Sequence, residues 1–121
     1  MAFLDSHPLS KGHTLVVPKA HVQLIESLTE EQSGALFKSV RKLTKYVQQA
    51  TNTNASLIGI NNGLESGQEV PHAHVHIIPR TRGDGGGPIH GAMHNRPVVT
   101  KDEMQRMAQD IRFAIKDDDL Y

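Results

Sequence analysis

The chain has no cysteine and no tryptophan, and its aromatic residues are three Phe and two Tyr among 121 residues. Without cysteine it can form neither a disulfide nor a cysteine-based zinc site, so a reducing, cytoplasmic setting is the expected one. So few aromatic rings make a stacking platform for single-stranded nucleic acid hard to build. No apolar run is long enough to span a bilayer, and no signal-peptide pattern is present. We therefore expect neither a nucleic acid nor a membrane as partner.

The charge composition leads to the same expectation. Lys and Arg together number 13, as do Asp and Glu, so the formal net charge is zero. Binders of nucleic acids or membrane surfaces usually carry a basic excess. Hydrophobic residues make up 37% and charged residues 21%, which favours a globular fold over disorder. The length fits one domain over residues 1–121.

The apolar periodicity predicts one long helix. Thr29 and Gln32 have the spacing of a capping box, in which each side chain binds a free backbone amide at a helix start. The helix is expected to end near residues 50–54, where Asn and Thr favour local side-chain bonds. Between these ends an apolar face repeats at the helical period, at Leu36, Val40, Leu43 and Val47.

A second helix is predicted near the C-terminus, where Thr100 and Glu103 repeat the capping-box spacing. Residues 80–99 hold five glycines and two prolines, and no regular structure is expected there. Strands are predicted over 13–18, 55–61 and 72–78. The sum is an α+β fold, with a mostly antiparallel sheet, one long helix and a C-terminal helix. The apolar stripe of that last helix consists of Met104, Met107, Ile111 and Ile115.

Residues 72–78 read HAHVHII and place a histidine at every second position. Strand side chains alternate between two faces. The three histidines are therefore predicted to share one face, and the apolar residues between them the core face. The histidines are His72, His74 and His76, and the core residues are Ala73, Val75 and Ile77.

Two interpretations compete for this row of histidines. Two of them could bind one zinc ion, but same-face residues lie about 6.6 Å apart along a strand, so three cannot converge on it comfortably. A zinc-dependent hydrolase would need another ligand, such as His13, His21 or His90. Alternatively, a neutral imidazole can attack phosphorus if one nitrogen is free and the other is held as a donor. A central histidine with a ring on each side suits that chemistry.

The motif HAHVHII resembles, at every position, the signature of the histidine triad family of nucleotide hydrolases and transferases. The resemblance extends to GHTLVVPKAH at 12–21 and to SGQEVPHAHVHIIPR at 66–80, and covers most of residues 2–84. It implies a HIT-like fold, a homodimer, and attack at the α-phosphorus of a nucleotide, with purine bases favoured. The ending IIPR is more similar to the microbial, diadenosine polyphosphate hydrolase-like members than to the phosphoramidases.

The resemblance also implies roles for the three histidines. His74 would be the nucleophile that forms a nucleotidyl-histidine. His72 would orient His74, largely through its backbone carbonyl. His76 would bind the phosphate and the bridging oxygen, in protonated form. One of His13 and His21 is expected near the pocket, the alternative being a buried core histidine and an exposed one.

The substrate-binding residues follow from the same resemblance. Asn61 corresponds to a polar residue beside the phosphate, and Gly67, Gln68 and Glu69 correspond to the phosphate loop. The family often has Ser or Thr where this chain has Glu69. Asp5 corresponds to the residue that holds the ribose hydroxyls.

The resemblance implies no metal in the chemical step, although Mg²⁺ could accompany a polyphosphate substrate. Both dinucleoside polyphosphates and nucleoside phosphoramidates fit the expected chemistry. Family members usually carry a further segment before AFLD at 2–5, so this sequence is interpreted as N-terminally short. A purine-nucleotide-binding module with little catalysis is therefore the main alternative to an enzyme.

Overall fold

The computed structural model describes residues 1–86, 98 and 100–119, with the backbone alone for residues 107, 111 and 114–119. The chain divides into two units, residues 1–89 and 90–121. Within the described part of the chain, no helix has the length and apolar character needed to cross a membrane.

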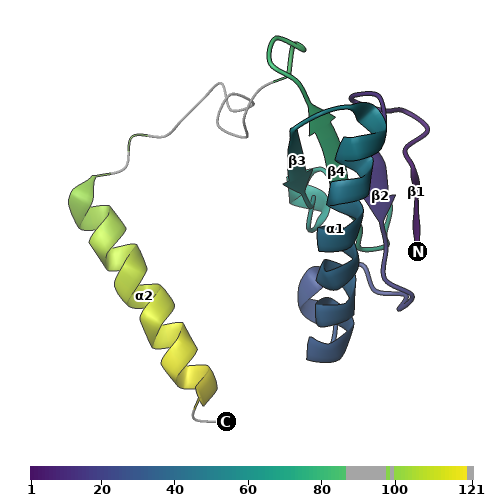
Figure 1. Cartoon of the computed structure of the whole chain (residues 1–121). Helices are drawn as coiled ribbons and strands as arrows, with labels where there is room; N and C mark the ends of the chain where they lie inside the picture. The colour runs from purple at the N-terminus through teal and green to yellow at the C-terminus, as the bar shows by residue number, and fades with distance from the viewer. Residues whose placement is uncertain (87–97, 99, 120–121) are drawn as a thin grey trace. The chain divides into compact units, whose positions relative to one another are not determined.

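The first unit is a four-stranded antiparallel sheet with a long helix packed on one face (Figure 1). The strands are β1 (Ala2–Leu4), β2 (Thr14–Val16), β3 (Ala55–Gly59) and β4 (Val75–Arg80), in the order β1-β2-β4-β3. The helix is α1 (Glu30–Thr51). The predicted α+β fold with a mostly antiparallel sheet is confirmed. Two short 3₁₀ turns complete the unit, η1 (Ile25–Ser27) and η2 (Leu64–Ser66).

Both ends of α1 lie where the sequence predicts them. The Gln32 amide donates to Thr29 Oγ1 at 3.1 Å, and the Thr29 amide donates to Gln32 Oε1 at 2.9 Å, which completes the capping box. Asn52 ends the helix in the left-handed conformation, with φ of 53°. Asn tolerates this conformation better than most residues.

The core lies between α1 and the sheet. Side chains of β4 and β2 meet the predicted apolar face of α1, and Leu43 and Val47 pack at its margin. Ala73, immediately before β4, is also buried. The alternation predicted for residues 73–77 is therefore confirmed. The buried cluster consists of Val16, Leu36, Val40, Val75 and Ile77.

The second unit contains α2 (Lys101–Asp119), so the predicted C-terminal helix is confirmed. The Glu103 amide donates to Thr100 Oγ1 at 3.2 Å. Met104 is 61% exposed. The side chains of Met107, Ile111 and Ile115 lie outside the described residues, as does most of the stretch 80–99 that was predicted to be irregular.

The strand that carries the histidines is shorter than predicted. It begins at Val75 rather than at His72, so only His76 of the three lies within β4. Pro71 has no N–H to donate, and the Ala73 amide donates to Val22 O at 2.7 Å instead of to a strand neighbour. His72 and His74 therefore lie in an extended segment that leads into β4.

Candidate active site

A cavity of about 720 Å³ opens on the side of the sheet that faces away from α1. Leu15 and His76 are register partners on β2 and β4, and both project from this side because their neighbours Val16, Val75 and Ile77 are buried against α1. Both apolar and polar side chains line the cavity. Its lining is Phe3, Leu4, Asp5, Ser6, His7, Leu9, His13, Leu15, Asn61, Gly67, Glu69, Val70, His74 and His76.

A second hollow of about 770 Å³ lies beside the first turns of α1. Val16, Pro18 and Leu36 are among its lining residues, and no histidine borders it. Because general acids, bases and nucleophiles are needed for chemistry, we place the candidate site in the histidine cavity.

The hydrogen bond of His74 fixes which of its nitrogens is reactive. His74 Nδ1 lies 2.8 Å from the backbone carbonyl oxygen of His72. A carbonyl only accepts, so Nδ1 carries the proton and Nε2 keeps its lone pair. His72 is held in turn by its Nε2, which donates to Pro18 O at 3.1 Å. The geometry thus gives His74 a free nitrogen that can act as a nucleophile, oriented by the His72 carbonyl.

His76 adopts the tautomer opposite to that of His74, with its proton on Nε2. A chain of hydrogen bonds that begins at the Leu9 amide determines this proton position. The Leu9 amide donates to His13 Nδ1 at 3.0 Å, so His13 carries its proton on Nε2. His13 Nε2 lies 2.9 Å from His76 Nδ1 and donates to it. The proton of neutral His76 must then be on Nε2. His76 therefore offers an N–H donor and His74 a lone pair, with their rings 4.9 Å apart.

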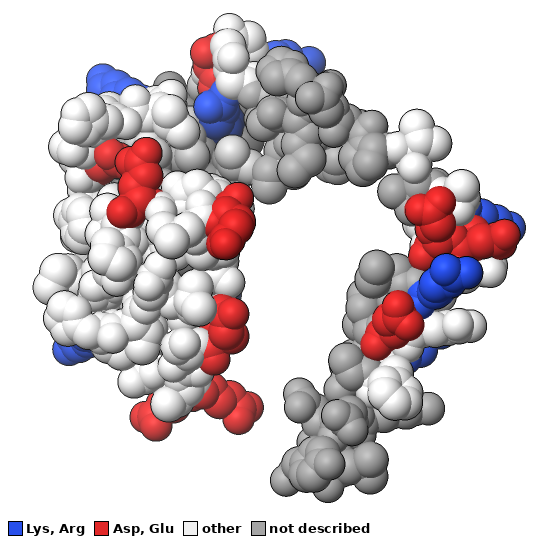
Figure 2. Space-filling model, turned by 180° about the vertical axis from the view of Figure 1, so that it is seen from behind, with Lys and Arg blue, Asp and Glu red and all other residues white. Residues whose placement is uncertain are grey.

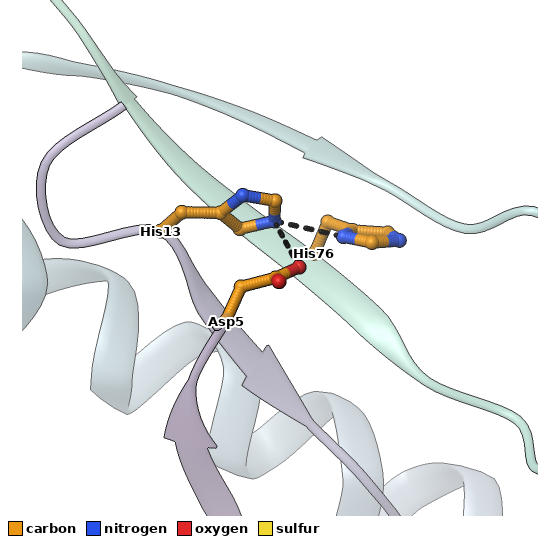
Figure 3. Close-up of side chains that lie close together, drawn as sticks. All are labelled: Asp5, His13 and His76. Atoms are coloured by element: carbon orange, nitrogen blue, oxygen red, sulfur yellow. Dashed lines mark hydrogen bonds and ion pairs between the residues drawn. The ribbon is translucent and has the colours of Figure 1, made fainter. Parts of the chain in front are cut away.

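Asp5 faces the same nitrogen of His13, Nε2, that contacts His76 (Figure 3). Its Oδ2 is 3.6 Å from His13 Nε2, and its Oδ1 accepts from the His7 amide at 2.8 Å. The His7 N–H is the main reason why the pKa of Asp5 lies below its usual value. From the sequence, His13 is a candidate zinc ligand and one of two histidines expected near the pocket. The structure shows a buried His13 whose Nε2 faces both His76 Nδ1 and the Asp5 carboxylate.

Asp5, His13 and His76 offer three ligand atoms within 4.8 Å of one another, the spacing of a metal site. A metal bound at His13 Nε2 would require the ring proton to move to Nδ1. Nδ1 already accepts from the Leu9 amide, so two N–H groups would face each other there. The contacts of His13 therefore match a hydrogen-bond relay better than a ligand set. They weaken the zinc interpretation, and His90, another of its candidate ligands, lies outside the described residues.

The loop before the histidines is held by Gln68. Its side chain is buried; Oε1 accepts from the Gly63 amide at 2.8 Å, and Nε2 donates to Gln23 O at 2.9 Å and Val70 O at 3.0 Å. Both amide hydrogens are used, and the side chain does not line the cavity. The structure therefore does not bring Gln68, predicted to bind substrate, to the site. Its contacts fix the shape of the loop.

The other predicted loop residues do line the cavity. Gly67 has φ of +92°, a conformation that other residues adopt only with strain, and it ends η2. Asn61 Nδ2 donates to Ser66 O at 2.6 Å, which ties β3 to this turn. Glu69 is exposed at the rim. Asn61, Gly67 and Glu69 thus line the same cavity as His74 and His76, and their role as a phosphate loop stays a prediction.

Burial lowers the pKa of His13 and of His76 below the usual 6.5, and for His76 the neighbouring His74 lowers it further. Both rings are therefore neutral at pH 7. In the chain without substrate this disfavours the protonated form expected for His76. The neutral ring carries its proton on Nε2, which can donate a hydrogen bond.

The same shifts predict how stability depends on pH. The unfolded chain binds protons on these histidines below about pH 6.5, whereas the folded chain resists protonation. The free energy of unfolding should therefore fall as the pH drops from 7 to 5. Urea titrations across this range should show the fall, with a smaller slope in His13→Gln. The Thr81 amide holds the pKa of Asp84 at about 2, so that group titrates outside this range. A stability that stays flat from pH 7 to pH 5 would contradict the prediction.

The family model described as HIT domain matches residues 1–83. A bis(5′-nucleosyl)-tetraphosphatase (asymmetrical) of Schizosaccharomyces pombe is 43% identical over 83 residues, which are 69% of this chain and 46% of that protein. A bis(5′-adenosyl)-triphosphatase of Dictyostelium discoideum is 35% identical over 83 residues, 69% of this chain and 56% of that protein.

The solved structures agree with the family model. A crystal structure of a Streptococcus mutans protein is similar with a TM-score of 0.82 and 35% identity, over 94% of this chain and 70% of that one. The chain spans about half the length of the two phosphatases. The matched residues include the whole cavity lining and the three histidines. With its antiparallel sheet and its HAHVHII segment, the chain belongs to the HIT domain family.

Proposed function

We propose that the protein is a nucleotide hydrolase or transferase in which His74 Nε2 attacks the α-phosphorus. The observation that carries this proposal is the bond from His74 Nδ1 to the His72 carbonyl, because it leaves Nε2 unprotonated and aimed by the backbone. The relatives named as a bis(5′-nucleosyl)-tetraphosphatase and a bis(5′-adenosyl)-triphosphatase support this class of activity.

The reaction proceeds in two displacements at phosphorus. In the first, a bond forms between His74 Nε2 and phosphorus as the bond to the leaving group breaks, and the leaving atom takes up a proton from solvent water. The positive charge that develops on the imidazole is stabilised by its Nδ1–H bond to the His72 carbonyl. In the second, water attacks phosphorus, the bond from phosphorus to Nε2 breaks with its electron pair returning to His74, and the proton of the water passes to solvent. His76 Nε2–H donates to a phosphate oxygen in both steps, where charge builds up in the transition state.

The lining of the cavity supplies the chemistry that a nucleotide needs. We assign the apolar Phe3, Leu4 and Leu15 to a purine base, and the Asp5 carboxylate to the ribose hydroxyls, from which it can accept. Asn61 Nδ2 donates one hydrogen to Ser66 O and has a second with which it can donate to a phosphate oxygen, and Gly67, whose own amide donates to Leu64 O, lets the backbone approach the phosphate closely.

We propose that the chemical step uses no metal. Mg²⁺ that arrives with a polyphosphate would meet oxygen ligands at Asp5 and Glu69, the carboxylates among the described lining residues. The homodimer implied by the resemblance stays a proposal. Phe37, Tyr46 and Ile58 are 45%, 53% and 43% exposed and give apolar surface that a second copy could cover.

The decisive experiment traps the covalent intermediate. Wild-type protein is mixed with an α-³²P-labelled dinucleoside polyphosphate or nucleoside phosphoramidate and quenched within milliseconds in alkaline denaturant, in which a phosphorus–histidine bond survives. We expect label on the peptide that contains His74, formed in a burst before steady turnover. Turnover without a labelled protein would overturn the covalent mechanism. If the protein binds nucleotide but does not turn it over, the alternative of a nucleotide-binding module without catalysis is supported instead.

A further inference from the structure

The charge of the cavity is unusual for a site that binds phosphate. Among the described residues, its lining includes two carboxylates, Asp5 and Glu69, and no Lys or Arg. Its lining also includes four histidines, His7, His13, His74 and His76, and burial lowers the pKa of His13 and His76. Seen from behind α1, the first unit also exposes more Asp and Glu than Lys and Arg (Figure 2). The described lining therefore presents carboxylates to a substrate without a Lys or Arg beside them.

The two carboxylates are placed differently. Asp5 is engaged by the His7 amide and lies 3.6 Å from His13 Nε2, on the β1 side. The Glu69 side chain is exposed and forms no ion pair or hydrogen bond with the described residues. Its backbone lies between Gly67 and Val70, in the loop that the buried Gln68 clamps. Glu69 thus brings an exposed carboxylate, without a hydrogen-bond or ion-pair partner among the described residues, to the cavity that holds His74 and His76.

A free carboxylate at that place discriminates between leaving groups. A polyphosphate leaving group brings several negative charges and would be repelled by Glu69. A leaving group with a positive charge would be attracted. Two unit charges about 6 Å apart, at an effective dielectric constant of about 40, change a rate constant by about tenfold.

We propose that Glu69 selects the leaving group by charge, so that this protein prefers nucleoside 5′-phosphoramidates whose amine carries a second, cationic group. This rests on the function proposed above. The bond from His74 Nε2 to phosphorus forms as the P–N bond breaks. The electron pair goes to the departing nitrogen, which takes a proton from solvent water. The distal ammonium group stays paired with Glu69 throughout, and water then releases the nucleoside monophosphate.

The test compares three substrates that share the adenosine 5′-phosphoryl group. Their leaving groups are 1,3-diaminopropane, which is cationic, n-butylamine, which is neutral and of similar length, and ADP, supplied as diadenosine triphosphate. The value of kcat/KM is measured for wild type, Glu69→Gln and Glu65→Gln. Glu65 is the matched control, because it is an exposed glutamate of the same loop that does not line the cavity.

We expect wild type to prefer the cationic amine over the neutral one, and Glu69→Gln to lower this ratio about tenfold. The same variant should raise kcat/KM for diadenosine triphosphate by a similar factor, and Glu65→Gln should change neither. Ratios unchanged in Glu69→Gln would overturn the inference. So would a loss of Mg²⁺-dependent triphosphate cleavage in Glu69→Gln, since Glu69 would then serve a metal-bound substrate.

The two proposals can fail separately. Turnover of the neutral amidate through a labelled His74 establishes the proposed function without reference to Glu69. If charge preference is then absent, the role of Glu69 alone is overturned. If wild type cleaves none of the three substrates, both proposals are overturned.

Discussion

Replacing His74 by alanine should slow the release of nucleoside monophosphate by about 10⁴- to 10⁶-fold, the range seen when a covalent nucleophile is removed. Without His74, water would have to attack phosphorus directly, and no other described group is held with a free nitrogen beside the phosphate loop. His76 cannot substitute, because its Nδ1 accepts from His13. Steady-state turnover and the trapped intermediate measure this effect, and both should be lost together.

The fold should survive this substitution. His74 is only partly buried, whereas its neighbours Ala73 and Val75 carry the packing against the core. Thermal unfolding of His74→Ala should therefore resemble that of wild type. His21→Ala is the matched control, because His21 is an exposed histidine whose ring lies 5.2 Å from that of His72 but does not line the cavity. If the His74→Ala protein turns over substrate at the wild-type rate, His74 is not the nucleophile.

Features set by neighbouring residues could be predicted from the sequence. The capping box of Thr29 and Gln32 depends on residues three apart, and the buried face at Val75 and Ile77 depends on the two-residue period of a strand. Such rules need no knowledge of the rest of the fold. The assignment of His74 as nucleophile came from the family resemblance, since alternation alone treats three histidines alike.

Features that depend on distant segments could not be predicted in this way. The start of β4 at Val75 follows from the contact of Ala73 with Val22, fifty-one positions earlier. The inward turn of Gln68 depends on its bonds to Gly63 and Gln23. Neither the start of β4 nor the orientation of Gln68 can be recognised from the neighbouring residues. A buried glutamine and a substrate-binding glutamine are the same residue type in the sequence.

The role of His13 is the clearest case of this limit. His13 and His76 are 63 residues apart in sequence, and the register of β2 against β4 brings them within hydrogen-bond distance. The proton position on His13 then depends on the Leu9 amide, a backbone group that every residue but proline possesses. The pKa of His76 is lowered because its ring is partly buried and lies beside His74, and the ring is therefore neutral at pH 7. A motif of residue types contains none of this information.

Replacing His13 by alanine should consequently be the second most damaging change. It removes the N–H that donates to His76 Nδ1, so His76 is free to place its proton on Nδ1 and to turn a lone pair toward the phosphate. Loss of one such donor from a transition state costs about 10²- to 10³-fold in kcat. We expect a fall of that size in kcat, with KM changed much less.

A purely structural role for His13 would give a different result. The ring is 2% exposed, so its removal leaves a cavity and also lowers stability. His13→Gln separates the effects, because its amide can accept from Leu9 and donate to His76 as the ring does, and it should recover a large part of kcat. Nitrogen-15 NMR of the His76 ring reports the proton directly. It should lie on Nε2 in wild type and His13→Gln, and be shared with Nδ1 in His13→Ala. If the proton of His76 stays on Nε2 in His13→Ala while kcat still falls, the hydrogen-bond relay is not the cause of the loss.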